Sequence, residues 1–196
     1  SFTRVGNQPR RMVAKIDSLG NVLPWEPTIT GVVVTTMMLR GNRIILAGRF
    51  EFVNGQFRNS IAEVDTASGK TTTALNIVAN RAGLLCSINS IDRWQNTLVL
   101  AGDFTHIGDS ARLRVAVIDT LTWRATSRII DVDPAAVKII VSGNQLFIGG
   151  ASTVNGISRS AIASINLATG VLSALTISPS ALSGISFVTY DMLLNG

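Results

Sequence analysis

Four stretches of this chain repeat one residue pattern, and this repeat constrains the possible folds more than any other feature of the sequence. Each copy has an arginine, then a β-branched residue followed by alanine, then an acid or its amide. The arginines are Arg10, Arg58, Arg112 and Arg159. The acids or amides are Asp17, Asp65, Asp119 and Asn166. Periods of about 20–50 residues are typical of solenoids and propellers, in which each repeat forms one packed unit.

The spacing of the arginines shows that the period continues through the ends of the chain. Successive arginines are 48, 54 and 47 residues apart, and the path from Arg159 through the C-terminus back to Arg10 is again 47 residues. The residues 192–196 followed by 1–2 also match the pattern of 44–50. The sequence therefore contains four whole repeats, cut at one equivalent point of the period.

Each repeat contains four segments that read as strands. The first is a β-branched run, at 31–38, 84–90, 137–141 and 185–190. The second is a short apolar segment that ends in glycine, at 43–48, 97–102, 145–150 and 192–196. The third carries the alanine, as in 61–64, and the fourth is more polar, as in 70–75. Asn54-Gly55 and Asn155-Gly156 predict two-residue hairpins, because both central positions of such turns require positive φ.

Short strands with a turn signal about every ten residues indicate an all-β antiparallel protein. Four antiparallel strands per repeat of about 47–54 residues predict the blade of a β-propeller. The recurrent alanine suits this fold, because a small side chain lets neighbouring sheets approach. We expect a single propeller domain over residues 1–196. It is either a closed four-bladed propeller, with strands of 185–196 sharing a blade with strands from 13 onward, or a slice of a larger propeller or array.

The consensus of the repeats is similar to a known family. An apolar strand followed by G-x-F-x-x-V-N-G-x-x-R-x-x-I-A-x-[IV]-D and then T/S-G resembles the delta-60-type, kelch-like propeller repeats of bacterial secreted and surface proteins. The segment 23–27 is similar to the W-x-P linker between such repeats. This resemblance implies a propeller that serves in binding or surface architecture, outside the cell or at its surface. It implies no catalytic residues.

The repeated polar residues have two possible roles. The four arginines could form a ring that binds an acidic ligand, because arginine grips carboxylates and phosphates with two parallel hydrogen bonds. The favoured interpretation is structural, because a residue found in every repeat usually serves the repeat. The acids could similarly act in acid–base chemistry, but Asn166 replaces one of them. We therefore predict that these residues cap tight turns through backbone amides.

Specific function is more plausible where the repeat is broken. The interval between Arg58 and Arg112 is 54 residues long, against 47 or 48 for the others, and we place Trp94 and its neighbours 92–96 in the insertion that lengthens it. Asp92, Arg93 and Trp94 are therefore the predicted binding residues, with the tryptophan placed to stack on a sugar ring or a partner side chain.

Composition restricts the chemistry that these residues could perform. Cys86 is the only cysteine and His106 the only histidine, so neither a metal site nor a Cys–His nucleophile is expected, and we expect no cofactor. The net charge is +5, but the basic residues are scattered, so we do not expect nucleic acid as a partner. No apolar run reaches the roughly 18 residues of a membrane span.

We therefore predict a non-catalytic extracellular module that presents loop faces to a protein or glycan partner. One alternative is an architectural repeat segment within a large surface assembly. The other is a carbohydrate-active propeller enzyme, which is disfavoured because the expected first strands of the repeats contain no aspartate or glutamate.

Overall fold

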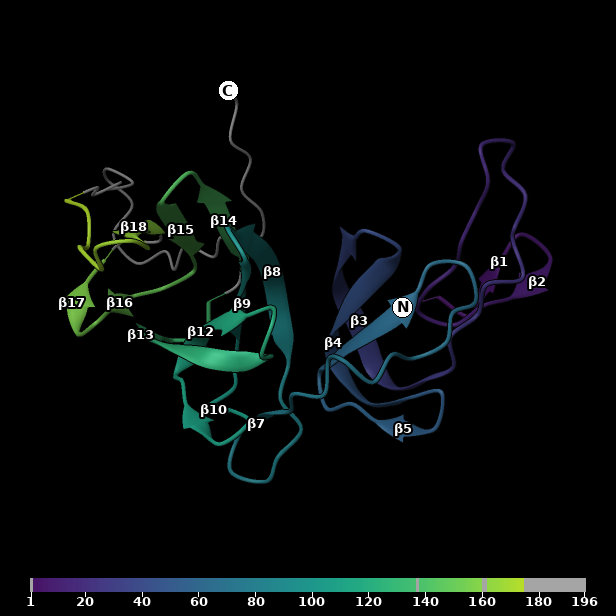
Figure 1. Cartoon of the computed structure of the whole chain (residues 1–196), viewed down its shortest axis with the longest axis horizontal. Helices are drawn as coiled ribbons and strands as arrows, with labels where there is room; N and C mark the ends of the chain where they lie inside the picture. Colours follow the sequence, from purple (N-terminus) through teal and green to yellow (C-terminus); the bar gives the residue numbers. More distant parts are fainter. Residues whose placement is uncertain (1, 137, 160–161, 175–196) are drawn as a thin grey trace, which may run out of the picture.

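The computed structural model describes residues 2–136, 138–159 and 162–174 (Figure 1). Within these ranges the chain is all β, with antiparallel strands in several sheets and no helix. The expected strands at 185–190 and 192–196, and the blade they would share with the N-terminus, lie outside the described residues.

One repeat forms a complete four-stranded sheet, here called sheet B. Its strands are β8 (Ile88–Trp94), β9 (Thr97–Gly102), β12 (Arg114–Asp119) and β13 (Arg124–Asp133). They neighbour one another in chain order, and every pair is antiparallel. The four central residues of β12 are all buried, so this strand is covered on both faces. Such burial explains why its sequence is continuously apolar rather than alternating.

The two flanking repeats form sheets with fewer strands, in the same order. Sheet A contains β3 (Ile29–Arg40), β4 (Arg43–Val53) and β6 (Ile61–Asp65). Sheet C contains β14 (Lys138–Ser142), β15 (Gln145–Gly149) and β18 (Ile162–Asn166). The fourth strand expected at 70–75 is reduced to one bridge between Val64 and Thr71, and sheet C has the equivalent bridge between Ile165 and Leu172. Both fourth segments are held by a few backbone hydrogen bonds to the third strand and by the side chains of Arg58 and Arg159, which donate to their carbonyls.

Each repeat has a short hairpin among the described residues. The hairpins are formed by the end of β4 with β5 (Gln56–Phe57), by β10 (His106–Ile107) with β11 (Ser110–Ala111), by β16 (Thr153–Val154) with β17 (Ile157–Ser158), and by β1 (Arg4–Val5) with β2 (Gln8–Pro9). Both residues of Asn54-Gly55 and of Asn155-Gly156 have positive φ, as predicted. All of these hairpins except β1–β2 also pair with a neighbouring strand segment. β7 (Ala79–Asn80) pairs with β10, the end of β13 pairs with β16, and the start of β3 pairs with the end of β4.

The long interval between Arg58 and Arg112 arises before β8, which corrects the sequence interpretation. Trp94 pairs with Thr97 in the same way that Arg40 pairs with Arg43, so the hairpin containing Trp94 has no extra residues. Residues 81–84 instead form a tight turn, closed by a bridge between Arg81 and Leu84. The strand expected at 84–90 therefore begins at Ile88 and runs on to Trp94.

Successive sheets pack against each other through separate apolar clusters. The cluster between sheets A and B includes Ile45, Ile61, Ile88, Leu98 and Phe104, all at most 1% exposed. The cluster between sheets B and C includes Val99, Ile130, Leu146, Ile148 and Ala163. β8 contacts β3 on one side and β14 on the other, and Figure 1 shows it between them. Each repeat thus depends on its neighbours for burial of its apolar faces.

Candidate functional site

The four repeated arginines point into the protein. Each donates from Nη1 to the carbonyl of the residue before it, and from Nη2 to a carbonyl on the segment that leaves the sheet. The Nη2 acceptors in order along the chain are the carbonyl oxygens of Leu23, Thr72, Thr126 and Ser173. Arg10 and Arg58 are only 6% and 8% exposed. Their donors are therefore directed at the protein backbone rather than at solvent.

Arg10 and Arg58 make further matched contacts that bind the hairpin to the linker. Arg58 donates to Gln56 Oε1 at 2.8 Å and to Asn76 Oδ1 at 3.2 Å. Arg10 has equivalent bonds to Gln8 and to the Glu26 carboxylate. The Nε atom of all four arginines is buried without a hydrogen-bond partner among the described residues. A structural role for the four arginines stays a prediction, which the stability of an Arg58 variant would test.

The repeated acids cap the turn after the third strand. The Asp65 carboxylate accepts the backbone N–H groups of Ala67 and Ser68 and the Ser68 hydroxyl. Asp119 accepts the same three bonds, from the backbone N–H groups of Leu121 and Thr122 and from the Thr122 hydroxyl. Asn166 uses its amide oxygen for the two backbone bonds. Asp17 likewise accepts backbone N–H groups from its turn. Because an amide oxygen makes the same backbone bonds, the contacts themselves do not require a charge.

These bonds make the stability of the chain depend on acid pH. Hydrogen bonds from Asn21 lower the pKa of Asp17, and bonds from Ser68 and from Thr122 lower the pKa values of Asp65 and Asp119. A lowered pKa in the folded state contributes stability above the unfolded value of about 3.9, and this contribution is lost as the pH falls through the lowered values. We expect the urea midpoint to decrease below about pH 4. The triple variant D17N/D65N/D119N should show a shallower decrease, and an unchanged acid dependence would contradict the prediction.

Asp92 and Trp94, two of the three predicted binding residues, connect sheet B to sheet C. Asp92 Oδ2 accepts the Val141 backbone N–H at 2.6 Å. The Trp94 indole N–H donates to Asn144 Oδ1 at 3.1 Å, and its ring packs against the apolar cluster between the two sheets. Trp94 is thus partly buried at a sheet boundary rather than exposed at a loop tip, although its ring also lines a depression formed with residues 126–129.

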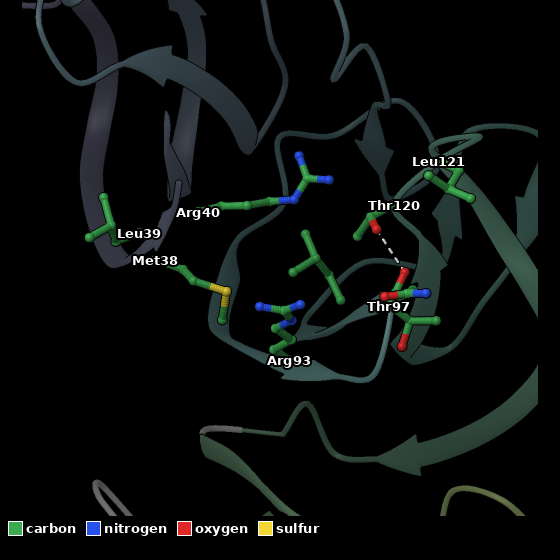
Figure 2. A pocket seen from close by; sticks show the side chains of 9 residues that line it. Met38, Leu39, Arg40, Arg93, Thr97, Thr120 and Leu121 are labelled. Atoms are coloured by element: carbon green, nitrogen blue, oxygen red, sulfur yellow. Dashed lines mark hydrogen bonds between the residues drawn. The ribbon is translucent and has the colours of Figure 1, made fainter. Parts of the chain in front are cut away.

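Arg93, the third predicted residue, is exposed and faces the other neighbour, sheet A. Together with Arg40 it lines a cleft of about 190 Å³ between the β3–β4 and β8–β9 hairpins. Figure 2 shows the two arginine side chains entering this cleft from different strands, with Leu121 at its far side. Arg40 is held by the buried Glu63 carboxylate at 3.5 Å and lies over the Trp123 ring, whose centroid is 5.2 Å away. The described residues that line the cleft include no acid.

Cys86 and His106 form no hydrogen bond with each other in the described part of the chain. Burial raises the pKa of the Cys86 thiol, which lies 3.5 Å from the Ser60 hydroxyl. The thiol therefore stays protonated at neutral pH and is a poor nucleophile. His106 is exposed on β10, and its Nδ1 lies 3.0 Å from the hydroxyl of Thr105. No group of three or more potential metal ligands occurs within the described part of the chain.

Trp123 is a tryptophan in a turn between strands that the sequence did not favour over Trp94 as a binding residue. Its backbone N–H donates to the Asp119 carbonyl, and the residues that make the same turn bond in the other repeats are Gly20, Gly69 and Gly170. All four residues have positive φ, which is 54° at Trp123. Aligning the turn 66–70 with 120–124 would have revealed this replacement of glycine by tryptophan.

Trp123 lines a cavity of about 450 Å³. The linker after sheet A supplies Asn76, the β10–β11 hairpin supplies Asp109 and Ser110, and the start of β13 supplies Arg124. A smaller cavity of about 250 Å³ occupies the equivalent place one repeat earlier, where Gly69 stands at the tryptophan position.

Comparison with known proteins identifies no family. No protein-family model matches the chain, and no curated protein matches it. One of the solved structures that match is the crystal structure of Saccharomyces cerevisiae Sqt1, at 11% sequence identity and a TM-score of 0.41. The match covers 92% of this chain and 57% of the Sqt1 chain. A likeness of this degree supports no inference about fold or function.

Proposed function

We propose that the chain is a non-catalytic β-propeller module that binds a protein or glycan partner outside the cell. The propeller part of the proposal is supported by the complete four-stranded sheet B and by the packing of each sheet against the next. Buried alanines at these boundaries, including Ala47, Ala101, Ala116 and Ala163, allow the close approach that stacked blades require. The extracellular location is supported by the family resemblance alone. No helix in the described ranges is long and apolar enough to cross a membrane.

The observation that carries the binding proposal is the cleft between Arg40 and Arg93. Two guanidinium groups face a space with no acid in its lining, and Arg93 is exposed there. A volume of about 190 Å³ is smaller than the roughly 300–1,000 Å³ of whole-ligand pockets. The cleft therefore suits a single acidic group that projects from a larger partner, such as a carboxylate or sulfate, bound by charge-assisted hydrogen bonds.

Two alternatives remain as different classes of function. An architectural role would be favoured by a much longer parent chain made of many such repeats. The enzymatic alternative requires at least two carboxylates that converge. Because β8 runs to Trp94, it contains Asp92, so the expectation that this strand has no acid is wrong. The Asp92 carboxylate nevertheless accepts two backbone N–H groups, and neither β3 nor β14 supplies a second acid. This arrangement gives the enzymatic alternative no support.

Arg93→Ala is expected to weaken binding of acidic partners about tenfold, because it removes charge-assisted hydrogen bonds worth about 1.5 kcal/mol or more. The measurement is binding to sulfated and sialylated glycans and to polyglutamate, at low and at physiological salt. The matched control is Arg49→Ala, which removes an equally exposed charge outside the cleft. Equal losses of affinity in both variants, or binding that disappears at physiological salt, would show that the net charge of +5 attracts acidic ligands non-specifically. Either result would contradict the proposal.

A further inference from the structure

The backbone at Trp123 is in a conformation that favours glycine. At φ 54° the Cβ of a bulky residue crowds the neighbouring backbone, which makes tryptophan unusual there. The equivalent positions in the other three repeats are glycines with φ between 71° and 85°. Turn geometry therefore does not account for the tryptophan. Side chains kept in such conformations cluster at binding sites, where the strain is offset by function.

Packing accounts for only part of the Trp123 side chain. The ring is half-buried, contacts the apolar cluster between sheets A and B, and lies beneath the Arg40 guanidinium. Its indole N–H has no hydrogen-bond acceptor among the described residues and is not one of the buried unpaired atoms, so it is open to solvent. The ring thus offers an apolar surface to the cavity that it lines, and its donor is available to a ligand.

Several polar groups around Trp123 also have no partner among the described residues. Neither Asp109 nor Arg124 forms an ion pair, and their side chains make no hydrogen bond to any other residue that the structure describes. Asn76 accepts from Arg58 through Oδ1, which leaves its amide N–H₂ group available. Asp109 is an acceptor with two oxygens, Arg124 offers a planar fork of N–H donors, and the Asn76 amide nitrogen offers two N–H donors that diverge from one atom. The planar groups of Asp109 and Arg124 match adjacent pairs of hydroxyls.

We propose that this cavity binds one ring of a neutral saccharide. A sugar ring has an apolar C–H face that packs on an indole and a rim of hydroxyls that both donate and accept, which fits one aromatic surface beside Asp109, Asn76 and Arg124. The volume of about 450 Å³ lies in the range of small-ligand pockets and exceeds a single sugar ring. One acid and one base make the lining neutral, so an anionic ligand has no advantage. No residue lines both this cavity and the Arg40–Arg93 cleft, but Arg40 lies over the Trp123 ring, so Asp109→Ala and Arg93→Ala are the variants that separate the two proposals.

The equivalent cavity one repeat earlier provides an internal comparison. It is lined by Glu26, Gln56 and Lys70, and it has Gly69 in place of the tryptophan. It therefore offers polar groups without an aromatic surface, and we expect it not to bind sugars. Trp123→Gly gives this site the same residue as the equivalent cavity. Because glycine already occupies this turn position in the other three repeats, the variant should fold.

The experiment is a glycan array of neutral oligosaccharides ending in glucose, galactose, mannose or N-acetylglucosamine, followed by isothermal titration of the strongest binder with the 196-residue chain. We expect saturable binding that is unchanged between 50 mM and 500 mM salt, on the order of tenfold or more weaker in W123G, and similarly weaker in D109A. The matched control Lys70→Ala, in the equivalent cavity, should bind as the parent does. Arg93→Ala should also leave this binding intact, which separates it from the acidic-group site.

Several outcomes would overturn the proposal. These are an array with no neutral binder, full binding by W123G, or equal losses in D109A and the Lys70 control. If W123G does not fold, D109A alone decides, because the Asp109 side chain is exposed and makes no contact that the fold needs. A folded D109A variant with unchanged affinity would contradict the proposed site.

Discussion

Replacing Arg58 with alanine is expected to lower the free energy of unfolding by about 3 kcal/mol, a large share of the roughly 5–15 kcal/mol typical of a domain. The guanidinium bonds to the carbonyls of Phe57 and Thr72 and to the side chains of Gln56 and Asn76. With Arg58 only 8% exposed, its loss leaves these acceptors partly buried and removes the link between the hairpin and the segment leading to sheet B. Urea denaturation followed by circular dichroism measures the effect.

Two further variants test whether the stability comes from the several hydrogen bonds of the guanidinium group or from its positive charge. Arg58→Lys retains the charge but cannot reach several acceptors at once, so it should lose about 2 kcal/mol. Arg112→Ala should lose less than Arg58→Ala, because Arg112 is only half-buried and bonds to two carbonyls. A loss at Arg58 no larger than that of the exposed Arg49→Ala would exclude the structural role. Lost binding of acidic ligands with full stability would instead favour the ligand-binding ring.

Gly102→Ala is expected to lower the free energy of unfolding by about 3 kcal/mol, at the upper end of overpacking effects. A Cβ at Gly102 would overlap the Ser87 carbonyl oxygen and lie 3.0 Å from Ile88 Cα. Ser87 cannot easily move away, because its carbonyl accepts the Asp103 N–H at 3.0 Å and its own N–H donates to the Asp103 carboxylate. The added methyl group must therefore separate β8 from β9.

The control for this prediction is Gly143→Ala. Gly143 lies in open space at φ 55°, so alanine there is strained by backbone conformation alone, at a cost of about 1 kcal/mol. Urea denaturation of both variants compares the stability lost through steric overlap at Gly102 with the stability lost through backbone strain at Gly143. If the two variants lose equal stability, the close approach of Gly102 to Ser87 is not what requires glycine.

Local patterns within a repeat predicted the parts of the fold that depend on a few neighbouring residues. The Asn-Gly hairpins, the turn caps at Asp65 and Asn166, and the buried alanines all follow from short-range geometry that the sequence displays. Strand ends were less predictable. β8 begins at Ile88 because the tight turn at 81–84 displaces its start, and an apolar residue such as Leu84 reads the same in a turn as in a strand.

The candidate sites required contacts between distant segments. Asp92 and Trp94 looked like loop residues, yet each bonds to a partner about 50 positions later in the chain. Trp123 was not singled out, because its cavity is assembled from the linker of one repeat and the hairpin and turn of the next. No pattern within a single repeat reveals such a combination.

The sequence by itself determined that one residue pattern recurs four times and that the described chain is all β, because strand periodicity, turn residues and their recurrence depend on local backbone preferences. Only the tertiary structure decided which departures from the repeat matter. The packing of sheet B between its neighbours partly buries Trp94, leaves Arg93 beside Arg40, and places Trp123 in a cavity with polar side chains. Exposure and juxtaposition of this kind depend on how one sheet lies against the next, which strand patterns alone do not specify.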